Sequence, residues 1–451
     1  MGTRIAFAFA FTTTFASNLL VDCASYLNVL SLMKTSYFHQ SISDSIDVAK
    51  IDGGTDGLHV FRRASSGLSS LQDTIRYEQL LSTDIHELVF IVQEKNIDEL
   101  ERILLDISNP SSPNYGNHLT RQDIINLTSD PVLRKDVTTY LEQAGATVVE
   151  GGASGGLVTA RGSIDLWSRM LNTQFYSFSS LRSNGDSENS QQLADMRFIR
   201  TNRYSVPSCL DKHIVSILNT IETPEVLSRR LPPPPPDFAQ NNRLQSLEIV
   251  TPQMLAKAYN IDDNIGHPRA TQEAFAYAQN YFSPEDLAIY QARLNLPNRP
   301  VNESYGSRTS EYCGRTGLCY EGNLDIQLMQ GISDTPTIFG WTRLMSLIDY
   351  VNNLVYSEKR PPLVISISYG ADEEASSADA YDAFNIAAMK LGAMGSTILV
   401  ASGDDGALSP KARDNGDNCY YKPDWPATSP WILSVGGTQV SPTSSYISLT
   451  C

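Results

Sequence analysis

The sequence has few histidines, and this scarcity narrows the hydrolytic chemistry that it can support. Of the six histidines in 451 residues, only His267 follows residue 249. A Ser-His-Asp triad needs an imidazole fixed between the nucleophile and the acid. His267 stands in an Ile-Gly-His-Pro loop sequence near the start of its region, where we expect a surface position. A serine hydrolase built from this region would therefore need another base.

Metal-binding and phosphate-binding motifs are also missing. No His, Cys or carboxylate cluster has the spacing of a metal site, and the glycine-rich segment 151–156 lacks the lysine and helix of a P-loop. After the N-terminus, no apolar run approaches the ~20 residues of a membrane span. A formal net charge of -16 and a pI near 4.8 would repel nucleic acids and anionic membranes. We expect neither of them as a partner.

The N-terminus indicates export. Residues 1–16 combine Arg4, an apolar stretch and small residues, which resembles a secretory signal, and we assign residues 1–23 to it. The alternative is a frayed N-terminus produced by a wrong start codon. Asn126 and Asn302 begin glycosylation sequons, which fit an exported chain.

Cysteine is sparse, with six residues in the whole chain. Cys313 and Cys319 are close enough in sequence to close a small disulfide loop. The other cysteines have no evident mates: Cys23, Cys209, Cys419 and Cys451.

The chain is long enough for two or three domains, because a single core seldom grows beyond ~250 residues. We assign no function to residues 24–85. Residues 86–206 form a small α+β domain, with expected strands at 86–92, 146–149, 156–160 and 174–178 and expected helices at 97–107, 130–144 and 164–171. Residues 207–249 form a linker that contains Pro232–Pro236 and that a protease could reach.

Residues 250–451 carry the pattern of a parallel, doubly wound α/β sheet. Expected strands at 363–368, 397–401 and 432–435 alternate with a helix from Tyr381 to Leu391. Helical spacing of apolar residues also predicts a helix from Trp341 to Val355. Functional sites of such sheets lie at the carboxyl ends of the strands.

Glu321 and Asp325 are four residues apart, with Leu324 and Leu328 at the same spacing. On a helix both carboxylates would lie on one face, where they can share protons as a coupled pair. The competing interpretation is a solvated helix face.

Asp404 follows an expected buried strand in the sequence Ser-Gly-Asp-Asp-Gly. A carboxyl group that stays protonated there could donate a hydrogen bond to a developing oxyanion. The competing interpretation is a polar turn, because Asp and Gly favour turns after strands.

Several segments, in order from about residue 86 to residue 440, resemble the sedolisin family of serine-carboxyl peptidases and the tripeptidyl-peptidases. Segment 106–120 resembles the signature of the family's propeptide, and 250–260 resembles the beginning of the mature peptidase. Glu321 to Asp325 matches the family's Glu-x-x-x-Asp motif, and segment 366–370 matches its substrate-lining strand. Segment 402–406 matches the oxyanion motif, and segments 423–430 and 434–438 together resemble the block that follows it.

The resemblance implies a subtilisin-like fold behind a propeptide domain. In it, Glu321 would be the general base, Asp325 its support and Asp404 the oxyanion stabiliser. Ser366, Ser368, Tyr369 and Gly370 would line the substrate. It further implies peptides and denatured proteins as substrates, the chain's own propeptide as an inhibitor, self-cleavage in the linker, and secretion or an acidic vacuolar or lysosomal compartment. A carboxylate base suits acid, where imidazole would be charged.

The sequence departs from the family's pattern at the nucleophile. The family's nucleophile lies in a Ser-Gly-Thr-Ser-x-Ser motif that these 451 residues do not contain, since Gly436-Gly437-Thr438 continues with Gln439. The resemblance also implies calcium for the complete enzyme, with its ligands beyond residue 451. It further implies that Cys419 pairs with a cysteine beyond that point, and that the parallel sheet is incomplete. We therefore expect a precursor truncated before its serine, with no peptidase activity as it stands.

An alternative is a non-catalytic protein whose propeptide-like domain inhibits a related peptidase. The sequence does not distinguish removal of tripeptides from internal cleavage, and it does not identify the activation bond between Pro207 and Thr251.

Overall fold

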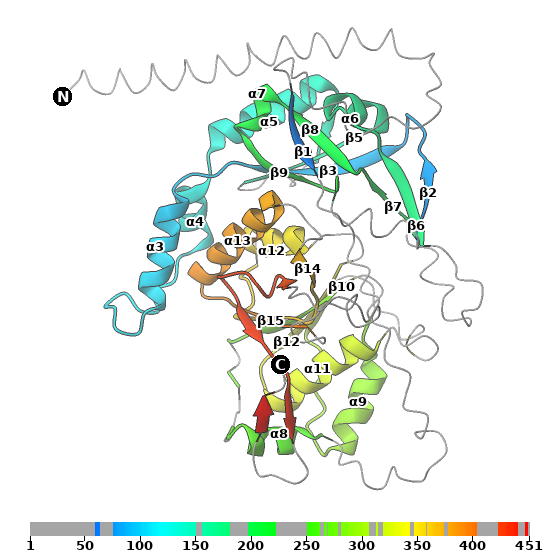
Figure 1. Cartoon of the computed structure of the whole chain (residues 1–451). Coiled ribbons are helices and arrows are strands. Elements are labelled where there is room, and N and C mark those ends of the chain that lie inside the picture. Colours follow the sequence, from blue (N-terminus) through cyan, green and yellow to red (C-terminus); the bar gives the residue numbers. More distant parts are fainter. Residues whose placement is uncertain are drawn as a thin grey trace, which may run out of the picture. The chain divides into compact units, whose positions relative to one another are not determined.

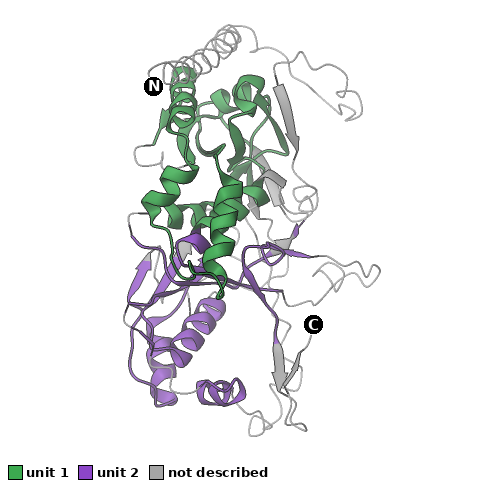
Figure 2. Cartoon of the chain, turned by 90° about the vertical axis from the view of Figure 1, so that its left-hand side faces the viewer, with its two compact units in different colours: residues 1–223, 346–356, 374–390 green, residues 224–345, 357–373, 391–451 purple. Residues whose placement is uncertain are grey.

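A computed structural model of the chain (Figure 1) describes residues 59–63, 75–149, 156–180, 197–221, 250–261, 266–267, 269–277, 281–305, 313, 319–342, 347–357, 359–373, 378–403, 423–440 and 447–449. Two compact units contain them (Figure 2). Unit 1 is Met1–Thr223, Ser346–Tyr356 and Glu374–Lys390; unit 2 is Pro224–Met345, Ser357–Glu373 and Leu391–Cys451. The expected signal segment 1–23 and residues 222–249 of the expected linker lie outside the described residues.

Unit 1 is an α+β unit whose largest sheet is antiparallel, in the order β4-β5-β3-β9, beside the smaller sheets β1-β8 and β2-β6-β7. Its strands are β1 (His59–Arg63), β2 (Ile75–Gln79), β3 (Ile85–Val92), β4 (Thr147–Val148), β5 (Leu157–Ser163), β6 (Tyr176–Ser180), β7 (Arg197–Arg200), β8 (Arg203–Pro207) and β9 (Ile214–Leu218). Its helices are α3 (Ile97–Ser108), α4 (Arg121–Thr128), α5 (Pro131–Ala144), α6 (Ile164–Met170), α7 (Ser208–Asp211), α12 (Leu347–Tyr356) and residues 378–390 of α13 (Ala378–Ala393).

Local sequence explains why helix α5 begins and ends where it does. The side chain of Asp130 accepts hydrogen bonds from the backbone N–H groups of Val132 and Leu133, and Pro131 occupies the first turn, where its missing N–H costs nothing. Gly145 then ends the helix at φ 99, a conformation that glycine adopts without strain. The helix is thereby fixed at both ends before it packs.

The core of unit 1 centres on β3 and the elements around it. Leu88 and Phe90 on β3 and Trp167 on α6 are each 0% exposed. Burying an apolar side chain of this size contributes about 1.5 to 3 kcal/mol. The indole N–H of Trp167 donates to the carbonyl of His86 at 2.9 Å, so the bulky ring is buried without an unsatisfied donor.

Unit 2 contains a parallel sheet of six strands in the order β11-β12-β10-β13-β15-β17. These are β10 (Gln272–Tyr277), β11 (Glu303–Tyr305), β12 (Thr337–Thr342), β13 (Val364–Ile367), β15 (Thr397–Ala401) and β17 (Leu433–Val435). Two antiparallel pairs join β14 (Ala371–Asp372) to β16 (Asp424–Trp425) and β18 (Thr438–Val440) to β19 (Ile447–Leu449). The helices α8 (Pro252–Ala258), α9 (Pro284–Arg293) and α11 (Tyr320–Ile332) complete the unit, with α11 packed on α8 and α9 (Figure 1).

The predicted fold class, a parallel α/β sheet preceded by a small α+β domain, is confirmed. Two details differ. Trp341 lies in strand β12 rather than in a helix, because β12 pairs with β10 and β11 and the helix α12 begins only at Leu347. Residues 208–218 do not form the beginning of a linker, because they build α7 and β9, and β9 pairs with β3.

Candidate active site

Helix α11 carries the two acidic residues that the sequence singled out. Glu321 lies in its first turn and Asp325 one turn later, and both side chains are partly buried. Ile326, on the inner face of the same helix, is 0% exposed in a core with Phe282 and Phe339. The helix is thus anchored on the sheet through its apolar face, while the two carboxylates occupy neighbouring turns.

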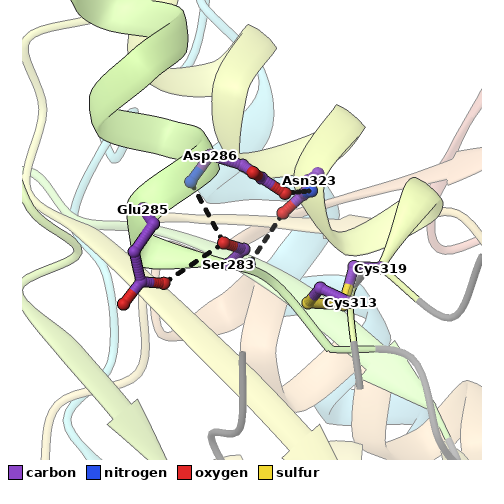
Figure 3. The surroundings of a disulfide bond; sticks show 6 residues. All are labelled: Ser283, Glu285, Asp286, Cys313, Cys319 and Asn323. Carbon is purple, nitrogen blue, oxygen red and sulfur yellow. Dashed lines mark hydrogen bonds between the residues drawn. A yellow bond between two sulfur atoms is a disulfide. The ribbon is translucent and has the colours of Figure 1, made fainter. Parts of the chain in front are cut away.

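A network of hydrogen bonds holds the beginning of α11 against α9 (Figure 3). The side-chain oxygen of Asn323 accepts from the backbone N–H of Ser283 at 2.8 Å, and its amide nitrogen donates to the carboxylate of Asp286 at 2.9 Å. Ser283 in turn caps α9 by accepting from the N–H of Asp286 at 3.0 Å. Asn323 stands two residues from both Glu321 and Asp325, so this network fixes the turn that joins them.

A disulfide and a close backbone contact also hold the beginning of α11 in place. Cys313 and Cys319 form a disulfide, and Cys319 is the residue directly before α11. Gly322 faces the backbone of Tyr281 so closely that any added Cβ would clash with the carbonyl oxygen of that residue. The position next to Glu321 is therefore limited to glycine by its packing. Cys209, which had no evident mate in the sequence, is disulfide-bonded as well.

A second contact joins α11 to the sheet. The hydroxyl of Ser368, in the residues that follow β13, donates to Oδ1 of Asp325 at 2.8 Å. This hydrogen bond fixes the orientation of the carboxylate. Of the residues expected to line the substrate, Ser368 is thus brought to the acidic pair.

Other segments that the sequence predicted to belong to the site meet at the carboxyl ends of the parallel strands. The backbone N–H of Ser402, just after β15, donates to the carbonyl of Val435 at the end of β17 at 3.0 Å. Gly403 adopts φ 95, and a Cβ there would collide with the carboxylate of Asp424. Gly370 lies close to the carbonyl of Trp425. This edge is where α/β sheets place their sites. Asp404, the next residue after Gly403, lies outside the described residues.

The remaining expected residues occupy varied surroundings. Ser366 is partly buried within β13, and Tyr369 is 4% exposed with its ring edge-on to that of Phe275. His267 is exposed, and its Nδ1 accepts from the backbone N–H of Arg269 at 3.1 Å. It lies on the surface, as its loop context suggested.

Both sequon asparagines are exposed, but their surroundings differ. Asn126 lies in α4, and the threonine of its sequon, Thr128, is 0% exposed with its hydroxyl bonded to the carbonyl of Ile124. The side-chain oxygen of Asn302 accepts from the N–H of Thr337 at 3.0 Å. Their glycosylation stays a prediction.

Among the described residues, no group of three or more His, Cys, Asp and Glu side chains could hold a metal ion. The calcium that the resemblance implies stays a prediction, and we assign no step to it. In the same ranges, no helix combines the length and the apolarity needed to cross a bilayer.

Comparison with known proteins agrees with these features. Residues 72–223 match the family described as Pro-kumamolisin, activation domain. Physarolisin of Physarum polycephalum is 27% identical over 374 residues, which cover 78% of this chain and 59% of the relative. The chain is therefore similar to the sedolisin family of peptidases. It is also 27% identical to tripeptidyl-peptidase 1 of Canis lupus familiaris over 365 residues, covering 78% of the chain and 61% of the relative.

The chain therefore spans about 60% of the length of these curated relatives. A solved structure of Pseudomonas sedolisin, a serine-carboxyl proteinase complexed with two molecules of pseudo-iodotyrostatin, aligns with a TM-score of 0.36 and 22% identity, over 43% of this chain and 55% of that chain. The family match places a propeptide domain in residues 72–223, which contain strands β2 to β9 and the main apolar core of unit 1. The exact domain boundaries stay predictions.

Sequence reasoning missed two residues of the site. The order Ser283-Pro284-Glu285-Asp286 is a helix start signal, with a capping hydroxyl followed by proline, and it could have located α9. Asn323 has no comparable local signal, because its role depends on α9 lying beside α11.

Proposed function

We propose that this chain is a member of the sedolisin family and belongs to the precursor of a peptidase that hydrolyses peptide bonds at acidic pH by a serine-carboxyl mechanism. The observation that carries the proposal is the pairing of Glu321 and Asp325 on one helix, with Asp325 bonded to Ser368 at the edge of a parallel sheet. The names of the relatives, physarolisin and tripeptidyl-peptidase 1, support the same reaction class.

Each residue then has a separate role. Glu321 accepts the proton of a serine hydroxyl as that oxygen attacks the peptide carbonyl, and it returns the proton to the departing amine. Asp325 orients Glu321 and shares its proton, and Ser368 holds Asp325 in place. Asp404 donates a hydrogen bond to the oxyanion.

A carboxylate base explains the choice of acidic pH. Imidazole is charged below its ordinary pKa of ~6.5 and cannot accept the serine proton there, whereas a carboxylate keeps its basic form further into acid. The substrates are peptides and denatured proteins, and the site of action is outside the cell or in an acidic vacuolar or lysosomal compartment. The propeptide domain inhibits the peptidase until the linker is cut.

The proposed mechanism also needs a serine nucleophile, and the family's serine motif is not found in this sequence. These 451 residues contain no Ser-Gly-Thr-Ser-x-Ser sequence, and we infer that this polypeptide by itself does not cleave peptides. The carboxylate mechanism needs a serine nucleophile beside these carboxylates.

The test compares this polypeptide with the protein translated from the full transcript. We expect no cleavage of a denatured protein at pH 4 by the 451-residue chain and clear cleavage by the complete protein. In the latter, Glu321→Gln should lower kcat by about 10²-fold to 10⁴-fold, the usual effect of a general base. Glu303→Gln removes an exposed carboxylate paired with Lys359 and is the matched control. A transcript that stops at codon 451 would refute the proposal for this gene.

One observation keeps the inhibitor alternative open. The propeptide domain has a large buried core of its own, which includes Leu88, Phe90 and Trp167. A domain with its own core could bind a related peptidase in trans. Adding the 451-residue chain to an acid peptidase of this family would show a loss of activity under this alternative, and unchanged activity would contradict it.

A further inference from the structure

Unit 1 contains a buried cluster of charged and polar groups that joins three segments distant in sequence. Glu94 follows strand β3, Tyr356 is the last residue of α12, and Lys390 lies near the end of α13. The Lys390 side chain is 0% exposed and that of Glu94 is 5% exposed. All three residues belong to the same compact unit (Figure 2).

The three side chains bond to one another in a closed arrangement. The ammonium of Lys390 donates to Oε2 of Glu94 and to the hydroxyl of Tyr356, the latter at 2.6 Å. The hydroxyl of Tyr356 donates to Oε1 of Glu94 at 3.3 Å and accepts from the backbone N–H of Gly156 at 3.3 Å. Gly156 also leaves room for the carboxylate, because an added Cβ would collide with it.

The charge balance of this cluster depends on Glu94. Burial by itself would lower the pKa of Lys390, but Glu94 and Tyr356 outweigh burial and the net shift is upward. Taking an ammonium out of water costs several kcal/mol unless a partner compensates. Among the described residues, the groups that face it are the carboxylate of Glu94 and the phenol of Tyr356. Arg121 of α4 donates to the backbone carbonyl of Tyr356 at 3.1 Å.

The partners come from different parts of the precursor. Glu94 lies within the propeptide match 72–223, whereas Tyr356 and Lys390 lie in helices beyond the linker. A lysine buried in the later part therefore obtains its counter-charge from the propeptide. Loss of that carboxylate by departure of the domain would leave a cation without its partner.

We propose that Glu94 is a charge latch: its ionised carboxylate holds the propeptide domain on α12 and α13, and neutralising it loosens this packing. The latch rests on the family assignment of residues 72–223 and not on the proposed catalytic roles. Its test needs no peptidase activity, so the two proposals can fail separately.

The experiment measures hydrogen exchange of the α12 and α13 backbone amides in the full 451-residue chain at pH 7, corrected for intrinsic rates. Removing one partner of a buried ion pair is far more disruptive than replacing both. Glu94→Gln should therefore lower protection of α13 by roughly 100-fold or more at pH 7. Lys390→Met should act in the same direction. The double variant Glu94→Gln with Lys390→Met should recover most of the lost protection.

A control variant separates the latch from ordinary packing. Glu99→Gln removes an exposed carboxylate of the same domain, 44% exposed and paired with Arg102, and should behave as the wild type.

Three results would overturn the latch. One is equal protection of α13 in the wild type and Glu94→Gln. Another is a double variant whose loss equals the sum of the two single losses. The third is a double variant that does not fold, because an ion pair replaced as a pair should be tolerated. A folded double variant beside an unfolded Glu94→Gln chain would support the latch.

Discussion

Acidification should weaken the propeptide domain through His86. This side chain lies on β3, where its Nε2–H donates to the carbonyl of Asn219 at 2.8 Å and its ring meets that of Phe175 edge-on. The guanidinium of Arg200, bonded to the side chain of Asn219, lies nearby. Burial lowers the pKa of His86 from 6.5 to about 4, the Arg200 charge adds to the effect, and the bond to Asn219 opposes it.

The sign follows from the lowered pKa. Between pH 6.5 and about 4 the unfolded chain binds a proton at His86 that the folded chain does not. The stability contribution is therefore fully present above pH 6.5 and is lost as the pH falls through this window. A pKa shift of one unit corresponds to about 1.4 kcal/mol. The lowered pKa of His86 should therefore reduce the free energy of unfolding by roughly 3 kcal/mol between pH 7 and pH 4.

The assay needs a signal from this domain alone. Trp167 is buried in its core and bonded to the carbonyl of His86, so a ¹⁹F resonance from 5-fluorotryptophan at this position reports local unfolding. Urea titrations of the whole chain at pH 7 and pH 4 give the free energy of unfolding of the domain. Trp167→Phe assigns the resonance.

A replacement that cannot be protonated separates the effect of His86 from that of the other titrating groups. His86→Gln keeps an N–H donor for the carbonyl of Asn219 but does not titrate, so its loss of stability between pH 7 and pH 4 should be smaller than that of the wild type by about 3 kcal/mol. His118→Gln changes an exposed histidine of the same domain and should retain the wild-type loss. Equal pH dependence in the wild type and His86→Gln would refute the reasoning.

Three further predictions concern the candidate active site. Replacing Cys313 and Cys319 together by serine should destabilise the start of α11 by about 2 kcal/mol, the loop-closure value for so short a loop, and hydrogen exchange of α11 should accelerate accordingly; unchanged exchange would contradict this. Asn323→Ala removes two hydrogen bonds to α9 and should cost about 2 kcal/mol in urea unfolding, whereas Asn295→Ala, beyond the end of α9, should cost less. In the complete protein, Ser368→Ala should lower kcat/KM by roughly tenfold to a hundredfold, because Asp325 loses a charge-assisted hydrogen bond, and Ser368→Thr should restore part of it; equal activity in all three forms would remove Ser368 from the mechanism.

Elements with strong local patterns were predictable from the sequence. The helices at 97–108 and 131–144 and the strands at 85–92 and 397–401 lie within a few residues of their predicted bounds. These segments combine apolar periodicity with clear end signals, such as Asp130-Pro131 and Gly145 around α5. Trp341 was misassigned because apolar residues at helical spacing continue from β12 into α12, and only the pairing of β12 with β10 separates the two.

The contacts that organise the site depend on long-range packing. The spacing of Glu321 and Asp325 follows from a helix, but the bond from Ser368 to Asp325 joins residues 43 apart. The Lys390–Glu94 pair joins residues 296 apart. Residues so far apart in sequence meet only through tertiary packing, so no local pattern predicts these contacts.

The most direct test of the carboxylate mechanism is the pH dependence of kcat/KM for peptide cleavage by the complete protein, measured from pH 3.5 to pH 7 in the wild type and in Glu321→Gln. A carboxylate base predicts that activity persists near pH 4 and is lost across the whole range in Glu321→Gln. Activity that disappears as the pH falls below ~6.5, the ordinary pKa of histidine, and that survives Glu321→Gln would contradict the mechanism.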